Sequence, residues 1–464
     1  MFDDRRGLAV TAASAEAVWR FDGVVESYLG FRLETGERLK AALAADPDMP
    51  LAQCTKGYFF KLFGMRALDP RAEAALASAR AALAARGGGT GRERLHVAAL
   101  EAWCRGDRVA ATDAWERILA RYPLDVLAIR LAHFTYFYMG ESRRLRESID
   151  RVLPAWGEDV PGYGYVLGCH AFGLEESGEY GLAERAGRRA VGLNPMDVWA
   201  THAVAHVMEM QGRSRDGIAW LTAHEADWGG VNSFANHVFW HRALFHLELG
   251  ERDAVLDLYD RRVRAEESTE NLDLCNAASL LWRLEEEGIG VGDRWRELGE
   301  RAARRVGDSA LTFVDEHLMM ALAAAGREAE AAALLASMRD HAAADATPEG
   351  EATRRVGLPL AEAILALRRG EPGRALERLL PIRCEVRRVG GSHAQRDVFG
   401  RMLVEAALRA GRFDVARGVL ADRLVARPAS RWGWEPYARA RAGAGVAEGA
   451  TGAEAPAARL RAAV

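Results

Sequence analysis

A glycine that is followed at fixed distances by an alanine and a proline recurs along this chain. In three segments, which begin at Gly106, Gly178 and Gly411, the alanine lies five residues after the glycine and the proline seventeen residues after it. Because the 464 residues include only 14 prolines, a proline at a repeated offset is informative. A motif that returns with a regular period predicts an array of similar units, each packed against the next.

The spacing of the glycines indicates the size of one unit. Gly106, Gly140, Gly178, Gly212 and Gly250 are 34, 38, 34 and 38 residues apart. Nearly every segment between them has helical periodicity, and none alternates strictly over six residues as a strand would. The pattern resembles tetratricopeptide repeats, in which glycine forms the turn between two antiparallel helices, alanine allows close packing and proline ends the unit. The predicted fold is therefore an all-α, tetratricopeptide-like helix-turn-helix repeat solenoid.

The repeats are not uniform along the chain. The segments at Gly212 and Gly250 keep the spacing but lack the alanine. We expect residues 1–90 to form a helical region with degenerate repeats and residues 91–440 to form the solenoid. Residues 441–464 are rich in alanine and glycine and predict a low-complexity, disordered tail.

Several helix starts can be placed from local sequence. Asp125 and Asp197 follow the prolines between repeats, where the next helix needs an N-cap. Ser392 and Gln395 are three residues apart and predict a capping box. The same stretch carries Arg396, which we expect to be the residue there that contacts an anionic ligand.

Composition limits the classes of partner. The net charge is -4, and 62 basic residues are interleaved with 66 acidic ones, so nucleic acid is not expected as a partner. No stretch approaches eighteen apolar residues, and the N-terminus lacks the apolar segment of a signal peptide. A membrane is therefore not expected as a partner either. Five scattered cysteines without a C-x-x-C pair indicate reduced, mostly buried thiols and a cytoplasmic protein.

Longer phrases resemble one family. "RERLHVAALEAW", "LNPMDVWATHAVAHVMEMQG", "NHVFWHRAL" and "LLPIRCEVRRVGGSHAQRDVF" occur in order between about residues 90 and 400. Together they are similar to the tetratricopeptide repeat protein 38 family. The resemblance implies an all-helical solenoid but no known reaction. It also implies that His170 and His393 lack a shared role, since the family more often has other residues at those positions.

Histidines are concentrated in one part of the chain. Six of the 12 histidines lie between residues 202 and 246. The offsets of His202, His206 and His237 from the turn glycines match positions that face the concave groove of such repeats, and His241 lies one step around the helix. We therefore expect a groove lined by histidine and aromatic side chains. The predicted ligand-binding residues are His96, His133, His202, His206, Glu209, His237, His241, Asp315, His317 and Arg396.

The histidine pairs allow three interpretations. His202 and His206 are four residues apart, as are His237 and His241, so each pair lies on one helix face and can share a metal ion. The ion would be zinc, iron or manganese, with a carboxylate from Glu209 or Asp315 as a further ligand. Against this, no H-E-x-x-H motif is present. The alternatives are a metal-free polar pocket and histidines that merely pack on neighbouring aromatic rings.

Two functions remain open at this stage. One is a repeat protein that binds a small ligand, a peptide or a partner protein in its concave groove. The other is an enzyme, metal-dependent and of hydrolase type, that uses His202, His206, His237 and His241. No Ser-His-Asp or Cys-His arrangement is supported, so no catalytic residue is assigned. The sequence fixes neither the ligand nor the oligomeric state.

Overall fold

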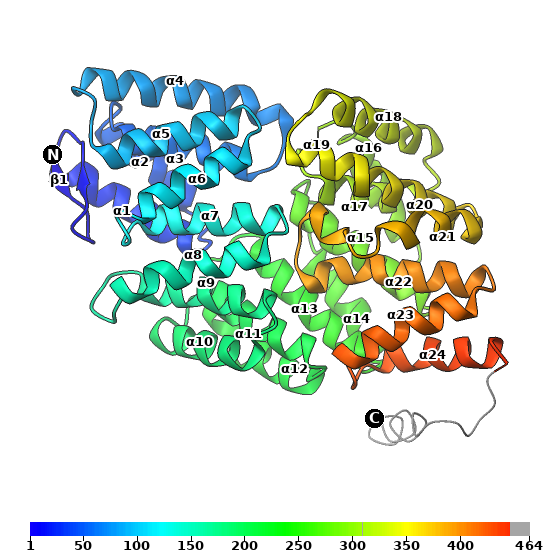
Figure 1. Cartoon of the computed structure of the whole chain (residues 1–464). Helices are drawn as coiled ribbons and strands as arrows, with labels where there is room; N and C mark the ends of the chain where they lie inside the picture. The colour runs from blue at the N-terminus through cyan, green and yellow to red at the C-terminus, as the bar shows by residue number, and fades with distance from the viewer. Residues whose placement is uncertain (309, 446–464) are drawn as a thin grey trace. The chain divides into compact units, whose positions relative to one another are not determined.

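The structure is a computed structural model that describes residues 1–308 and 310–445. The described residues are almost entirely helical, and Figure 1 shows successive helices folding back on one another in pairs. The prediction of an all-α fold built from helix-turn-helix units is confirmed. The exception is a short antiparallel strand pair at the N-terminus, β1 (Phe2–Asp3) and β2 (Ala9–Val10), with Phe2 opposite Val10.

The helices are named by their order in the chain. Those up to residue 210 are α1 (Ala15–Leu29), α2 (Thr35–Ala45), α3 (Pro50–Leu62), η1 (Arg66–Leu68), α4 (Asp69–Ala85), α5 (Gly91–Cys104), α6 (Arg108–Leu119), α7 (Val126–Tyr138), α8 (Ser142–Val152), η2 (Leu153–Ala155), α9 (Tyr163–Glu176), α10 (Tyr180–Leu193) and α11 (Val198–Met210). Those that follow are α12 (Ser214–Ala223), η3 (Glu225–Trp228), α13 (Phe234–Glu248), α14 (Arg252–Leu258), η4 (Tyr259–Val263), α15 (Asn271–Glu286), α16 (Arg294–Ala303), α17 (Thr312–Ala324), α18 (Glu328–Ala344), α19 (Pro348–Ala352), η5 (Thr353–Gly357), α20 (Leu358–Arg368), α21 (Pro372–Ile382), η6 (Val386–Val389), α22 (His393–Arg409), α23 (Phe413–Ala426) and α24 (Arg431–Gly443).

The repeat glycines form the turns within helix pairs, as the sequence predicts. Consecutive helices such as α5 and α6, α9 and α10, and α22 and α23 pack together. Between them, Gly106, Gly178 and Gly411 have φ values of 81°, 81° and 71°. These left-handed values carry a steric cost for any residue with a Cβ atom, which explains the recurring glycine. The alanines five residues later are fully buried, so a larger side chain would push the paired helices apart.

The predicted helix caps are also present. Asp125 accepts a hydrogen bond from the backbone N–H of Ala128, and Asp197 accepts from Trp199 and Ala200. Each of these caps satisfies N–H groups that have no partner inside the helix. The capping box at the start of α22 is formed by Ser392 and Gln395.

The chain forms two compact units. The first comprises Met1–Val204 with His224–Ala235, and the second comprises Ala205–Ala223 with the described residues from Asn236 onward. The predicted division into 1–90 and 91–440 stays a prediction. Most of the predicted tail, 446–464, lies outside the described residues.

In the first unit, a buried polar network ties the N-terminal segment to the helices. Arg92 of α5 donates to Asp125 at 3.2 Å and to the carbonyl oxygen of Ala9 at 3.2 Å. Asp125 also lies 3.0 Å from Nε2 of His96, whose backbone carbonyl accepts from Tyr58. Each of these side chains has at least one polar partner, which lowers the cost of burying the network.

In the second unit, arginines hold the last helices against α15. Arg401 of α22 is buried and donates to Glu286 at 2.6 Å and to Glu287 at 3.0 Å, both of which are mostly shielded from solvent. The guanidinium groups of Arg401 and Arg423 also lie 4.3 Å and 4.7 Å from the ring of Trp432. These ion pairs and cation–π contacts fix the walls of the polar interior described below.

No described helix is both long enough and apolar enough to cross a lipid bilayer. The five cysteines are unpaired, and Cys54, Cys169 and Cys275 are buried, as the sequence predicts.

Candidate metal centre

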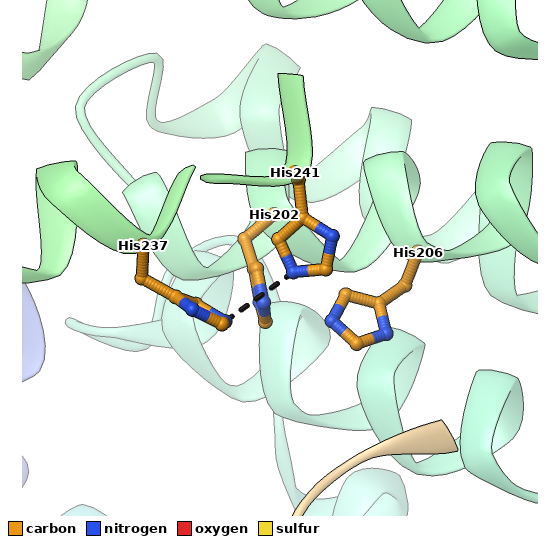
Figure 2. Close-up of side chains that lie close together, drawn as sticks. All are labelled: His202, His206, His237 and His241. Atoms are coloured by element: carbon orange, nitrogen blue, oxygen red, sulfur yellow. Dashed lines mark hydrogen bonds between the residues drawn. The ribbon is translucent and has the colours of Figure 1, made fainter. Parts of the chain in front are cut away.

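Two histidines of α13 direct their ring nitrogens at one point. His237 and His241 are one helical turn apart, and their Nε2 atoms are separated by 3.3 Å. Figure 2 shows the two side chains with a dashed line joining these nitrogens. Two ligands at about 2.05 Å from a tetrahedral ion are themselves about 3.3 Å apart. The spacing of the Nε2 atoms is therefore the spacing that two zinc-bound imidazoles would have.

The outer nitrogen of each ring is held by a polar side chain from another helix. Nδ1 of His237 lies 2.9 Å from Oδ1 of Asn276 on α15, and Nδ1 of His241 lies 2.8 Å from Oε2 of Glu209 on α11. Such partners fix the orientation of the ring and, when they accept the Nδ1 hydrogen, leave Nε2 with a lone pair. Histidines that bind metals are oriented in this way.

Helix α11 supplies two further histidines. The ring of His206 lies 4.4 Å from that of His241, centroid to centroid. His202 precedes His206 by one turn of the same helix, and its ring stacks on Phe172 and contacts Trp199. Each of the four histidines has a ring nitrogen within 4.8 Å of those of the others (Figure 2). They form a buried group that could hold a metal ion.

The burial of this group differs from the expectation, made from the sequence, that these histidines line a concave groove. His206 and His241 are fully buried, and His202 and His237 are 2% and 3% exposed. Aromatic side chains fill the space that an open groove would need, and Trp240 stacks on His237 with ring centroids 5.3 Å apart. The histidines therefore line an interior and not an open surface.

Burial also sets the charge state of the group. Loss of solvent, together with the neighbouring histidines, lowers the pKa of His237 and of His241 well below the ordinary value. Both imidazoles are thus neutral near pH 7, which is the form that binds metals. Burial has the opposite effect on Glu209, where it raises the pKa of the carboxyl group although Arg427 and His206 act against it.

Two predicted residues in the first unit have other surroundings. His96 belongs to the network of Asp125 and Tyr58. His133 of α7 is enclosed by the rings of Phe134, Phe172 and Trp199 at centroid distances of 6.0, 5.7 and 5.5 Å. Their predicted role in ligand binding stays a prediction.

The predicted residues of α17 and α22 have separate environments as well. The Nδ1 atom of His317 lies 2.7 Å from the carbonyl oxygen of Phe313, and its ring packs between Phe313 and Phe399. Asp315 is buried on the same helix and is not a member of the four-histidine group. The Arg396 guanidinium bonds the carbonyl oxygen of Gly391 at the turn before α22. The predicted roles of Asp315, His317 and Arg396 in binding a ligand stay predictions.

Asn276, which orients His237, was not predicted from the sequence. The hydrogen-bond partner of a histidine depends on which helix packs beside it, and local sequence does not show this. A local signal was present. Asn276 and Arg283 are seven residues apart on α15, so they lie on one face, and both are buried in a helix that is otherwise largely apolar. Buried polar side chains at this spacing indicate an internal polar site.

No family model matches the sequence. The chain is similar to a solved structure of Naa15/Naa10 bound to HypK-THB, with 13% identity, a TM-score of 0.25, and coverage of 96% of this chain and 71% of that chain. It is also similar to the TPR domain of P58(IPK), with 12% identity, a TM-score of 0.22, and coverage of 80% and 98%. At these values the likeness concerns distant helical-repeat folds and carries no argument about function. The resemblance to the tetratricopeptide repeat protein 38 family stays a prediction.

Proposed function

We propose that this helical-repeat protein is a metal-dependent protein that binds a divalent transition metal, with zinc as the best fit, at His206, His237 and His241. The observation that carries the proposal is the convergence of two neutral imidazoles. Their Nε2 atoms are 3.3 Å apart, and their outer nitrogens are held by Asn276 and Glu209. Packing alone does not require both the convergence and the outer partners.

The ligand set favours zinc over harder cations. Three imidazole nitrogens suit zinc, copper, iron or nickel, whereas magnesium and calcium prefer oxygen. A tetrahedral ion with three protein ligands keeps its fourth position for water or a substrate, while four protein ligands would close the site. We assign the ligands to His206, His237 and His241, and we place His202 in the aromatic surroundings that it shares with Phe172.

The open fourth coordination position determines which class of reaction the metal ion could support. A zinc ion lowers the pKa of a bound water to about 7 and so supplies hydroxide at neutral pH. Held by His206, His237 and His241, such an ion would supply an activated water for hydrolysis of an acyl or phosphoryl compound. We therefore propose hydrolysis of a small molecule as the reaction, since the histidines lie in a buried interior that excludes a long peptide.

The test is the metal content of untagged protein that has not been exposed to chelators. We expect about one zinc per chain in the wild type and less than a tenth of that in His237→Ala. His246→Ala is the matched control, because His246 lies on the same helix but bonds Glu251 outside the four-histidine group. Equal metal in all three proteins, or none in any, would refute the proposal. A positive result justifies screening esters, amides and phosphoesters with the zinc-loaded protein.

A second candidate function is binding of a partner protein by the outer surface. It is favoured by exposed apolar side chains on and beside α10: Leu182, Leu193 and Met196 are 44%, 42% and 48% exposed. Leu182 and Leu193 are eleven residues apart, which is about three helical turns, so both lie on one face. If this face binds a partner, Leu193→Glu will abolish the co-purification that the wild type shows while leaving metal content unchanged.

A further inference from the structure

The second unit contains a polar cavity next to the histidine group. Its volume is about 50 Å³, which is room for a few water molecules or one oxyanion. The walls come from the end of α11, from α13 and α15, and from α22 and α23. The polar lining residues used below are Glu209, Glu248, Arg283, Asp397, Arg423 and Arg427. Because Glu209 also holds His241, one side chain connects the cavity to the proposed metal site.

Several charges around this cavity already balance one another. Arg423 bonds Asp397 through both of its terminal nitrogens, and Arg427 lies 3.5 Å from the same carboxylate. These arginines hold the pKa of Asp397 far below its usual range despite burial, so this carboxylate is ionised. Asp397 is thus already shared by two cations.

Arg283 differs from the other arginines of the cavity. Its side chain is 1% exposed, and its terminal nitrogens donate to the backbone carbonyls of Ser279 and Ala394 at 3.0 Å and 2.9 Å. Within residues 1–308 and 310–445 it forms no ion pair. Burial lowers its pKa to about 10, so the guanidinium remains charged at neutral pH. Asp397 and Glu209 stabilise this charge from a distance, but no carboxylate of the described residues contacts it, and an anion in the adjoining cavity would offset the remaining cost of burial.

The two glutamates of the cavity do not supply that counter-ion. Glu209 contacts Nδ1 of His241, and Glu248 accepts a hydrogen bond from the backbone N–H of Trp432. Neither carboxyl group forms an ion pair with Arg283. The cavity therefore has a buried guanidinium group on its wall that no carboxylate in the described part of the chain contacts directly.

We infer that this cavity binds an oxyanion, a carboxylate or a phosphate group, with Arg283 and Arg427 as its cationic contacts. The anion would lie in the cavity that Glu209 helps to line. If the proposed metal site is also correct, its ligand is a small molecule with an anionic end; this second step rests on the proposed function. The anion site itself does not depend on a bound metal.

The test is calorimetric titration of the full-length protein, treated with chelator and dialysed into a low-salt buffer at pH 7, with inorganic phosphate and separately with acetate. We expect at least one of the two probes to bind at one site per chain. The probe that binds more tightly shows whether the natural ligand carries a phosphate or a carboxylate group. Arg283→Met should weaken binding at least tenfold. Arg412→Met is the control, because Arg412 pairs with Asp414 and is exposed.

A second variant protects the test against loss of folding. Arg427 is only partly buried, so Arg427→Gln should keep the fold and still weaken binding several-fold. Absence of binding by either probe, or affinities unchanged in both Arg283→Met and Arg427→Gln, would overturn the inference. Metal content is measured on separate samples of the same proteins that have not been exposed to chelator. Phosphate or acetate binding without any metal would refute the metal proposal alone, whereas metal without anion binding would refute this inference alone.

Discussion

Glu209 Oε2 and His241 Nδ1 lie 2.8 Å apart, although 32 positions separate the two residues in the sequence. Burial raises the pKa of Glu209 and lowers that of His241, so both shifts favour the neutral form of the pair when no ion is present. Glu209 can then donate to Nδ1, and the Nε2 hydrogen of His241 can bridge to His237. A metal ion at Nε2 displaces that hydrogen, and Glu209 must release its proton to accept from Nδ1. Metal binding and proton release are therefore coupled.

This coupling predicts a pH-dependent metal affinity. Below the pKa of Glu209 in the metal-free protein, the affinity of wild-type protein for zinc should rise by about tenfold per pH unit as the pH increases, since one proton leaves for each ion bound. Glu209→Gln cannot release that proton. The variant should bind zinc about 10–100-fold more weakly and lose most of the slope. Competition with a chromophoric chelator over a pH series that starts near 4.5, the ordinary pKa of a glutamate, measures both quantities. An unchanged slope in the variant would assign the proton to another group.

The assignment of three ligands predicts unequal effects of the two histidines of α11. The ring of His206 lies 4.4 Å from that of His241, while His202 stacks on Phe172 and contacts Phe234. His202→Phe should fit these aromatic surroundings and change zinc affinity less than tenfold, whereas His206→Phe should weaken it at least a hundredfold. The same chelator competition measures both variants. Equal losses would show that the ion has four protein ligands and a closed coordination sphere.

The sequence predicted the fold well because its strongest signals are local. Glycine recurs at positions such as Gly106 and Gly178 because it adopts a left-handed φ value without the steric cost that other residues incur. Asp125 caps the helix that directly follows it. Each of these properties depends on a few neighbouring residues. The helix-turn-helix units could therefore be predicted without knowing how distant segments pack.

The candidate site was only partly predictable for the opposite reason. The spacing of His237 and His241 within one helix placed them on one face, and the structure shows their nitrogens converging. The partners Asn276 and Arg283 lie on α15, and their contacts depend on which side chains fill the space between helices. The expectation of an open groove differed from the structure because Trp240 and other rings pack around the histidines.

One departure from the repeat pattern has a steric explanation that can be tested. Gly217 stands five residues after Gly212, where other repeats have alanine, and a Cβ atom there would lie 2.3 Å from the ring of Phe245. Gly217→Ala should therefore destabilise the protein by about 1–3 kcal/mol, although alanine favours helices. Gly192→Ala on α10 meets no atom within 4 Å and should stabilise it by about 0.5–1 kcal/mol. Urea unfolding of the two variants and the wild type compares these effects, and stabilisation by both would contradict the steric argument.

Acid should destabilise the protein partly through His317. Burial lowers the pKa of this imidazole to about 4, although its hydrogen bond with the Phe313 carbonyl opposes the shift. In the unfolded chain its pKa is about 6.5, so between pH 6.5 and 4 the unfolded state binds more protons. The free energy of unfolding therefore falls as the pH falls through this window, by roughly 3 kcal/mol in total.

The His317→Asn variant lacks the pH-dependent contribution of the imidazole to the free energy of unfolding. Its side-chain amide can still donate a hydrogen bond to the Phe313 carbonyl. We expect the variant to be less stable than the wild type at pH 7, with the difference shrinking as the pH is lowered to 4.5. Urea unfolding followed by circular dichroism gives both curves. Glu316, the preceding residue, has a raised pKa caused by burial and by Asp315, and it destabilises the fold as the pH rises. Because Glu316 acts equally in both proteins, the difference between the two curves isolates His317. A difference that stays constant with pH would show that this imidazole titrates alike in the folded and unfolded chain.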